Sequence, residues 1–352
     1  MTTADYDTIA VRPDEAIDIS RLRDYLAGRL PGAGNDLAVR QFGGGHANLT
    51  YLLDYGTVEY VLRRPPLGPV APGSHDMKRE YQVLSRLWQA FAPAPRAYHL
   101  CEDDSVIGSP FFVMERRHGV VIRNEVPQVF GAGADVIANR KLSEVVVRTL
   151  TEFHAVDPAI CGLDQLGHPE GFLQRQVEGW LQRWQRARHE DNPTAERVAG
   201  WVAARIPNSP HPTLVHNDWR LDNMAVSPVD PGVCSAVYDW DMCTRGDPLA
   251  DLGTLLAVWY EEGEVPATLN PMPTSVPGFF NRSQALELYG AKTGLDLSGF
   301  GWYLVFGTWK LGVVLQQIFI RWRRGQTMDE RFSGMGDAAR RLFELADERT
   351  PG

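Results

Sequence analysis

Apolar and polar residues alternate in short runs through the first third of the chain, which is the pattern of β-strands. The runs lie at residues 37–42, 49–54, 57–63, 106–107 and 111–115. Tyr55-Gly56 joins the second run to the third, and a turn at residues 108–110 joins the last two, so the pattern predicts two β-hairpins. Amphipathic helices are predicted over about residues 15–30 and 76–90.

From about residue 117 onward, apolar positions recur every three or four residues, as they do in amphipathic helices. Helices are predicted near residues 142–153, 173–184 and 196–205, with two or three more between 284 and 348. Short strands are expected only within residues 212–239, and the proline-rich stretch 266–277 is expected to be a long loop.

These elements predict an α+β fold with two lobes. Residues 1–116 are expected to form a small antiparallel sheet with one helix, and residues 117–352 a large, mainly helical lobe. A cofactor is expected to bind in the cleft between two such domains.

Composition and charge narrow the function classes. The 352 residues include 35 basic and 44 acidic ones, a formal charge of −9, which argues against nucleic acid or an anionic membrane as a partner. Residues 1–18 lack the basic and apolar regions of a signal peptide, and the apolar stretch 300–320 is interrupted by Lys310, so we expect a buried helix there. The four cysteines have no zinc-site spacing. A cytoplasmic protein with reduced thiols is predicted.

The strongest chemical signal is the segment from His216 to Asn223, followed by Asp239 at the end of an apolar run. Transfer of a phosphoryl group from ATP needs a residue that orients the acceptor hydroxyl and oxygen ligands for Mg²⁺. Asp218 can orient the hydroxyl, while Asn223 and Asp239 can hold the ion. A hairpin predicted between Asn223 and Asp239 would bring these two residues together.

A glycine-rich segment lies between two predicted strands of the first lobe. Gly43, Gly44 and Gly45 directly follow the strand at 37–42. Glycine allows backbone N–H groups to approach phosphates closely. The position of the run therefore predicts a loop that covers a nucleotide, although its spacing differs from the G-x-G-x-x-G of protein kinases.

Three segments resemble the aminoglycoside phosphotransferase and choline kinase superfamily, relatives of protein kinases: residues 214–223, 237–241 and 246–253. The resemblance covers about residues 39–325. It implies a protein-kinase-like two-lobed fold with ATP and Mg²⁺ as cofactors. It also implies that Asp218 is the catalytic base, and that Asn223 and Asp239 are Mg²⁺ ligands.

The same resemblance concerns three further positions. Asp251 is expected to brace the catalytic segment from a helix, as the corresponding aspartate does in the family. Asn217 departs from the family, whose members usually have glycine there. Asp241 is either a further metal ligand or a surface carboxylate.

In the first lobe, the superfamily pairs a helix glutamate with a strand lysine that also contacts the nucleotide phosphates. Glu80 lies on the apolar side of its helix, where a carboxylate requires a partner. This chain has Arg63-Arg64 at the strand end, and alternation lets only one of them face inward. The motif favours Arg63, whose fork can grip both Glu80 and a phosphate. The hinge that binds adenine through its backbone is expected at Met114, Glu115 and Arg116.

Residues 61–68 and 75–81 are most similar to one branch of the superfamily, which includes kinase domains fused to acyl-CoA dehydrogenases. That branch commonly has arginine in place of the strand lysine, and it is linked to the phosphorylation of hydroxyacyl thioesters. The resemblance thus implies a small-molecule alcohol substrate such as a hydroxy acid or hydroxyacyl-CoA, and a functional link to acyl-CoA dehydrogenases. The sequence shows no dehydrogenase domain, so dehydrogenase activity is not expected.

Other substrates and functions remain open. An aminoglycoside or a choline-type amino alcohol would favour an acidic cleft, which Glu261, Glu262 and Glu264 could supply unless they form a solvated charge run. The chain could instead be a nucleotide-binding scaffold without catalysis, or a metal hydrolase that uses His216, Asp218 and Asp239. Candidates for the substrate wall, most of which are expected to be core, are Trp180, Trp184, Trp259, Phe279, Phe280, Tyr303 and Lys310.

Overall fold

The computed structural model of the chain divides into two compact units. The first contains residues 1–118 together with the short segments 159–163 and 236–243, and the second contains the remaining residues. Sequence patterns had assigned both short segments to the helical lobe. The structure describes residues 7–34, 36–43, 48–67, 76–268, 271–327 and 329–350.

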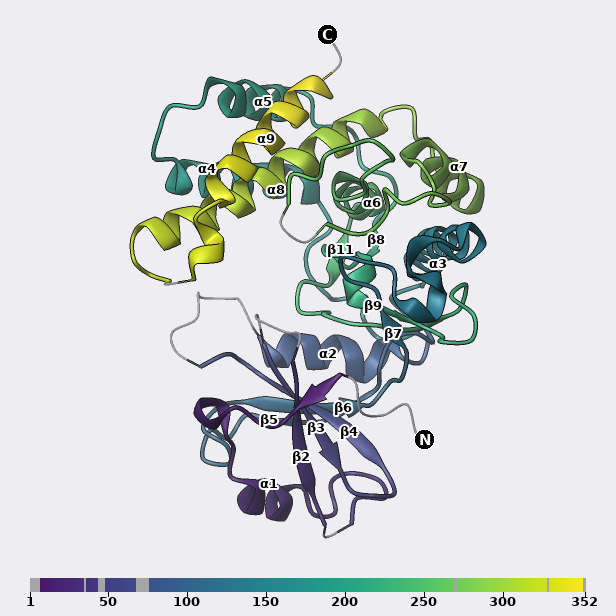
Figure 1. The fold of residues 1–352 in the computed structure, drawn as a ribbon, viewed down its shortest axis with the longest axis vertical. Coiled ribbons are helices and arrows are strands. Elements are labelled where there is room, and N and C mark those ends of the chain that lie inside the picture. The colour runs from purple at the N-terminus through teal and green to yellow at the C-terminus, as the bar shows by residue number, and fades with distance from the viewer. Residues whose placement is uncertain are drawn as a thin grey trace. The chain divides into compact units, whose positions relative to one another are not determined.

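A six-stranded antiparallel sheet forms the centre of the first unit, with its strands in the order β1-β2-β3-β4-β6-β5 (Figure 1). The strands are β1 Thr8–Ile9, β2 Ala38–Phe42, β3 Leu49–Asp54, β4 Glu59–Arg64, β5 Ala97–Cys101 and β6 Phe111–Glu115. Between β3 and β4, the Tyr55 N–H donates to the Val58 carbonyl at 3.0 Å, and Gly56 has the positive φ that this turn requires. The first predicted hairpin is confirmed.

Two helices pack on the sheet. α1 (Ile19–Leu26) begins after Asp18 and α2 (Met77–Leu87) begins after Asp76, and each of these aspartates caps its helix with a carboxylate. Because side chains alternate along a strand, one set of strand residues joins the core with α1, and the other set faces the side on which α2 packs against β5 and β6. The core on the α1 side includes Leu22, Leu26, Tyr51, Leu53, Leu62, Phe111 and Val113.

For the second predicted hairpin, the prediction of its first strand is wrong. Val106 and Ile107 lie in a turn, and the strand that pairs with β6 is β5, which the sequence pattern did not reveal. Asp103 starts the turn, because its carboxylate accepts the Ser105 N–H at 2.9 Å and its carbonyl accepts the Val106 N–H at 3.2 Å. Val106 and Ile107 are nevertheless buried in the core, so their apolar character reflects burial and not strand pairing.

The second unit is mainly helical. Its helices are α3 Val136–His154, α4 Phe172–Ala187, α5 Pro193–Ala204, α6 Pro248–Ala257, α7 Arg282–Thr293, α8 Phe300–Arg323 and α9 Met335–Glu348. α8 packs against α4, α5, α6 and α9 (Figure 1). By length and composition alone α8 could cross a membrane, but 61% of its most apolar window is buried inside the structure. The predicted buried helix is therefore confirmed.

Short strands interrupt these helices, and two of them lie outside the predicted stretch 212–239. Within that stretch are β8 Thr213–Val215, β9 Met224–Val226 and β10 Cys234–Val237, and outside it are β7 Val120–Val121 and β11 Thr244–Gly246. β10, β9 and β7 form one sheet, and β11 pairs with β8. β9 and β10 are neighbours, as the predicted hairpin required. The α+β class, with a sheet lobe and a mainly helical lobe, is confirmed.

Candidate active site

Residues 216–223, which connect β8 to β9 and which we call the catalytic loop, hold Asp218 and Asn223 in direct contact. Asn223 ends a short 3₁₀ helix, and its backbone N–H donates to the Arg220 carbonyl at 3.1 Å. Its side-chain nitrogen donates to the carbonyl oxygen and to the carboxylate Oδ2 of Asp218, each at 2.9 Å. The residues predicted as base and as one metal ligand are thus adjacent within the second unit.

Asp251 of α6 holds the backbone of the catalytic loop. Its Oδ2 accepts the N–H of His216 and its Oδ1 accepts the N–H of Asn217, both at 2.6 Å. Hydrogen bonds to an ionised acceptor are shorter and stronger than neutral ones. The geometry therefore shows Asp251 in the bracing position that the family resemblance implies.

A histidine that sequence reasoning did not select supports Asp251 in turn. His154 ends α3, and its Nε2 lies 3.3 Å from Oδ2 of Asp251 while its Nδ1 lies 2.7 Å from the Tyr289 hydroxyl. Burial raises the pKa of Asp251, but the contacts with His154 and His216 outweigh burial and hold this pKa below its usual value. Because His154 and Asp251 are 97 residues apart in sequence, no local spacing could have indicated the pair.

Asn217 has a left-handed backbone conformation, with a φ of +69°. Glycine enters this region without steric cost, and asparagine tolerates it better than most other residues do. The residue that replaces the glycine usual in the family therefore keeps the conformation that this position requires.

The indole of Trp219 anchors the catalytic loop to α3. The side chain is fully buried, and its Nε1 donates to the Val146 carbonyl at 3.2 Å. Its ring stacks on Phe153, with the two ring centroids 5.7 Å apart. This packing restrains the backbone next to Asp218.

Arg220 brings positive charge to the same loop. Its Nε donates to the Asp222 carboxylate. Burial lowers the pKa of Arg220, but the carboxylates of Asp222 and Asp218 raise it above its usual value. The guanidinium therefore stays cationic beside Asp218.

In the first unit, Arg63 connects Glu80 with Asp239. Its Nη1 lies 2.8 Å from Oε1 of Glu80, and its Nη2 donates to the Asp239 carboxylate. Arg64 lies on the other face of β4 and donates to the Ile107 carbonyl at 3.0 Å. Arg63 is therefore the partner of Glu80, as alternation along the strand and the motif together predicted.

Glu80 is completely buried, and burial dominates its ionisation. Burial raises the pKa of Glu80 to about 8, while the Arg63 guanidinium and the Trp240 N–H act in the opposite direction. Burial lowers the pKa of Arg63, but Glu80 and Asp239 raise it well above its usual value, so the guanidinium stays cationic. Oε2 of Glu80 is buried without a hydrogen-bond partner among the described residues, which is typical of a site that a ligand completes.

Asp239 has an unusual backbone for its residue type, with a φ of +65°. Such conformations outside glycine cluster at active sites, because the surrounding structure must hold them in place. The side chain is 29% exposed and so can reach a ligand. Asp241 adds its negative charge to the field at Arg63 and Glu80, and its role as a metal ligand stays a prediction.

The glycine-rich run lies where the sequence placed it, between β2 and β3. Gly43 directly follows β2, and its N–H lies 3.5 Å from the Asp7 carbonyl. Gly44 and Gly45 lie outside the described residues. The role of the run in covering a nucleotide stays a prediction.

The residues predicted as the hinge lie at the end of β6. Met114 and Glu115 are its last two residues, and the Glu115 N–H donates to the Arg96 carbonyl at 2.8 Å. Arg116 follows the strand and pairs with Asp7 at 2.8 Å. Adenine binding by this segment stays a prediction, and it would use backbone groups other than the Glu115 N–H.

The oxygen donors of the predicted metal ligands fit Mg²⁺. Asn223 uses its side-chain nitrogen on Asp218, which leaves its side-chain oxygen as a ligand, and Asp239 offers a partly exposed carboxylate. In the part of the chain that the structure describes, no group of three or more His, Cys, Asp and Glu side chains is placed to hold a metal. Mg²⁺ at a kinase site needs only one or two such ligands beside the nucleotide phosphates.

Most of the aromatic residues proposed for the substrate wall are fixed inside the second unit. Trp184 donates to Glu196 at 2.9 Å, and Tyr303 donates to Asp247 at 2.8 Å. Trp259 donates to the Phe280 carbonyl at 2.8 Å. These rings belong to the core, as most were expected to.

Comparison with known proteins decides the family. Residues 38–270 match the model of the phosphotransferase enzyme family. The chain belongs to this family. The match confirms the predicted resemblance to a family of phosphotransferases.

Curated relatives of this phosphotransferase family member carry the names of acyl-CoA dehydrogenases. Acyl-CoA dehydrogenase family member 11 of Rattus norvegicus is 30% identical over 336 residues, which are 92% of this chain and 42% of that protein. Its namesake in Gallus gallus is 36% identical over 251 residues, 70% of this chain and 31% of that protein. The chain therefore spans less than half the length of these relatives. The predicted branch is confirmed, while the names indicate no substrate.

Solved structures in the family have the same fold. A Ralstonia eutropha protein assigned as an aminoglycoside phosphotransferase is 28% identical, with a TM-score of 0.81 over 95% of this chain and 98% of that one. Aminoglycoside phosphotransferase APH(4)-Ia, in complex with ADP and hygromycin B, has a TM-score of 0.58 at 16% identity, over 90% of this chain and 95% of that one. The protein-kinase-like fold is confirmed, and the second of these neighbours was solved with ADP bound.

Proposed function

We propose that this chain transfers the γ-phosphoryl group of Mg·ATP to a hydroxyl group of a small molecule. The arrangement around Asp218 carries the proposal. Asn223 donates two hydrogen bonds to Asp218. Asp251 accepts the N–H groups of the two residues that directly precede Asp218. A carboxylate held in this way is oriented before the substrate arrives, so the reaction does not have to order it.

Three residues of the catalytic loop have a role in the transfer. Asp218 accepts the proton of the acceptor hydroxyl as its oxygen forms a bond to the γ-phosphorus. The bond from that phosphorus to the bridging oxygen breaks, and ADP leaves with the electron pair. Asn223 keeps the carboxylate oriented, and Arg220 places a positive charge beside it. Mg²⁺, which Asn223 and Asp239 would hold, supplies neutralisation of the phosphate charge.

In the first unit, Arg63 takes the role that lysine has in related kinases. A planar guanidinium can bind a carboxylate and a phosphate at the same time, whereas an ammonium acts as a point charge. Glu80 and Asp239 fix its orientation. We therefore expect Arg63 to bind nucleotide phosphates without loss of charge.

The substrate that we favour is a hydroxy acid or a hydroxyacyl-CoA, and a cytoplasmic location belongs to the same proposal. Relatives named after acyl-CoA dehydrogenases support a link to acyl-CoA chemistry. An aminoglycoside or an amino alcohol is the alternative, and it is supported by the likeness to the Ralstonia eutropha protein.

Replacement of Asp218 tests the function. In an ATP-consumption assay over hydroxy acids, hydroxyacyl-CoAs, amino alcohols and aminoglycosides, Asp218→Asn should lower kcat by about 10²–10⁴-fold, because a positioned base is lost. Its affinity for ATP should stay unchanged. Asp239→Asn should also weaken binding of Mg·ATP, measured by calorimetry.

Asp230→Asn is the matched control, because Asp230 is an exposed carboxylate on the turn after β9, paired with Lys141 at 3.1 Å. It should keep both turnover and ATP affinity. Wild-type turnover by Asp218→Asn would disprove the role of this residue. Nucleotide binding without turnover on any acceptor class would favour a nucleotide-binding scaffold instead.

A further inference from the structure

Two cations of the second unit share one tryptophan ring. Trp180 of α4 is buried, and Cζ of Arg183 lies 4.4 Å from its ring centroid. Nζ of Lys310, on α8, lies 5.3 Å from the centroid of the Trp180 ring. Both distances are within the range of cation–π contacts. Because α4 packs against α8, positive charges from two elements converge on one indole.

Neither cation is paired with an acidic side chain. Among the residues that the structure describes, the side chains of Lys310 and Arg183 form no ion pair and no hydrogen bond. Lys310 is half-buried, whereas Arg183 is exposed. Burial, together with the charge of Arg183, lowers the pKa of Lys310. The carboxylates of Asp218 and Asp251 act in the opposite direction but do not outweigh burial. A partly buried cation beside a second cation is costly, and an anion would relieve that cost.

Lys310 is connected to the catalytic loop through α6. A Cβ atom on Gly307 of α8 would lie 2.6 Å from the Gly253 carbonyl oxygen, so the two helices touch backbone to backbone there. Lys310 follows Gly307 by about one helical turn. On the other side of the contact, Gly253 follows Asp251, which holds the catalytic loop, by two residues. This packing places the turn of α8 that carries Lys310 next to α6, which holds the catalytic loop.

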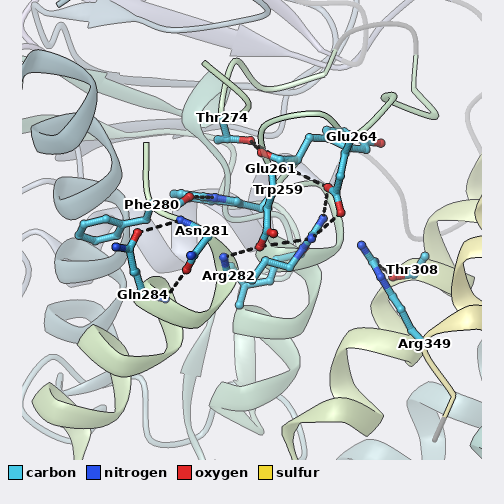
Figure 2. Close-up of polar contacts among 12 residues, drawn as sticks. Trp259, Glu261, Glu264, Thr274, Phe280, Asn281, Arg282, Gln284, Thr308 and Arg349 are labelled. Atoms are coloured by element: carbon cyan, nitrogen blue, oxygen red, sulfur yellow. Dashed lines mark hydrogen bonds and ion pairs between the residues drawn. The ribbon is translucent and has the colours of Figure 1, made fainter. Parts of the chain in front are cut away.

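The acidic residues that a polycationic substrate would favour are engaged elsewhere. Nη2 of Arg282 lies 2.6 Å from Oε2 of Glu264, and its Nη1 lies 3.4 Å from Oε1 of Glu261. The Glu261 N–H also donates to Glu264 at 2.9 Å, and Figure 2 shows Arg282 joined to both carboxylates. Only Glu262 of this run is exposed. Two of the three carboxylates of the predicted acidic wall are therefore already neutralised.

We propose that Lys310, together with Arg183 and the ring of Trp180, binds a negatively charged group of the acceptor substrate. The inference rests on the phosphotransferase function proposed above. It makes Lys310 a specificity-determining residue that favours hydroxy acids and their CoA thioesters over aminoglycosides and amino alcohols. Its ammonium binds a carboxylate or phosphate oxygen, while Asp218 takes the hydroxyl of the same molecule.

Lys310→Met tests the inference, because methionine keeps an unbranched side chain and removes the charge. With 3- and 4-hydroxy acids as acceptors, the KM for the acid should rise about 10- to 100-fold, the effect of losing a charged hydrogen bond. The kcat and the KM for ATP should change little. Methyl esters of the same acids should show no such rise. Lys310→Arg should recover most of the affinity.

Lys292→Met is the matched control, since Lys292 is an exposed lysine on α7. It should leave every KM unchanged. An equal rise in KM for the acids and their methyl esters would overturn the inference. No rise for either would overturn it as well if the binding of hexanoyl-CoA is also independent of Lys310. A fall in kcat alone would overturn it too, since that would make Lys310 a positioning residue for Asp218.

A binding measurement separates this inference from the proposed function. Hexanoate, which lacks the hydroxyl, should bind the AMP-PNP-loaded protein in calorimetry, and Lys310→Met should weaken it while Asp218→Asn does not. Affinities for hexanoate and for hexanoyl-CoA that are both independent of Lys310, in an enzyme that phosphorylates hydroxy acids, would overturn the inference alone. The same measurement with hexanoyl-CoA distinguishes the source of the anion. If hexanoyl-CoA binds more tightly than hexanoate and Lys310→Met removes the difference, the anion is a CoA phosphate. If hexanoyl-CoA binds no more tightly than hexanoate, the anion is the carboxylate.

Discussion

At the scale of single residues, the catalytic loop depends on a buried carboxylate and on an uncommon backbone conformation. Asp251 replaces two hydrogen bonds that the N–H groups of His216 and Asn217 would otherwise make to water. The left-handed φ of Asn217 turns both N–H groups toward the same side chain. Position 217 therefore accepts asparagine or glycine, and a β-branched residue there should be strained.

Asp251→Asn should destabilise the fold and slow turnover. The two backbone N–H groups bond to different carboxylate oxygens, and in asparagine one of these oxygens becomes an NH₂ group that cannot accept. We therefore expect a loss of about 3 kcal/mol in the free energy of unfolding at neutral pH. The folded-state pKa of Asp251 lies below its ordinary value of 3.8, so the stability from its ionised form is complete above that value and is lost as the pH falls through the folded-state pKa. Urea unfolding of the two proteins should therefore converge in acid.

Asp296→Asn is the control for this measurement. The pKa of Asp296 is also lowered, by the backbone and side chain of Ser298, but the carboxylate is exposed on a turn. It should change stability little at any pH. A stability difference between wild type and Asp251→Asn that stays constant from pH 7 to pH 3 would contradict the assigned ionisation.

At the scale of elements, the contact between α6 and α8 depends on glycine. A Cβ on Gly253 would lie 2.6 Å from the Tyr303 carbonyl oxygen, and a Cβ on Gly307 would lie equally close to the Gly253 carbonyl. Backbone atoms cannot move aside as a flexible side chain can, so the two helices would have to separate. α6 carries Asp251, so the close packing also sets the position of the catalytic loop.

Gly253→Ala should therefore cost about 1–3 kcal/mol of stability, the usual cost of overpacking, although alanine is the better helix former. Its kcat should fall as well, because Asp251 moves with α6. Gly200→Ala, in the middle of α5 with nothing within 4 Å of the added Cβ, should instead stabilise by about 0.5–1 kcal/mol. Urea unfolding measures both, and equal stabilisation by the two substitutions would contradict the close contact.

Elements with a clear period were predictable, and those defined by distant partners were not. Period-two alternation and a glycine turn located β3 and β4 to within two residues. β5 was missed because its residues are only partly apolar, and the buried pair Val106-Ile107 drew the prediction to itself. A pair of apolar residues indicates burial. Whether the pair also forms a strand depends on a neighbouring strand that can hydrogen-bond to it.

At the scale of the whole molecule, nucleotide binding should be visible as added stability. AMP-PNP with Mg²⁺ at about 100 times its Kd should stabilise the protein by about 2.7 kcal/mol, because the ligand binds only the folded state. EDTA should remove most of this gain, and Asp239→Asn should reduce it, in a thermal unfolding experiment. Stabilisation by AMP-PNP that is the same with and without EDTA would contradict the Mg²⁺ role of Asp239.

From the sequence, only those residues of the candidate site that belong to a local motif could be predicted. The order of Asp218, Asn223 and Asp239 was readable because the spacing is local, and strand alternation together with the motif selected Arg63. The support of Asp251 by His154 and the convergence of Arg183 with Lys310 on Trp180 involve residues far apart in the chain or on separate helices. Such contacts follow from tertiary packing, which a single sequence does not encode in any visible period.

Because residues 236–243 belong to the first unit, this unit cannot be expressed in full as a short N-terminal fragment. A fragment that stops at residue 118 would lose Trp240, whose ring packs on Phe91 with centroids 6.1 Å apart and whose N–H donates to Glu80 at 3.3 Å. The apolar surface around Phe91 would be exposed and Glu80 would lose the Trp240 N–H, so we expect such a fragment to aggregate. We therefore expect that residues 1–118 do not fold on their own, because the last segment of this unit is translated more than a hundred residues after residue 118.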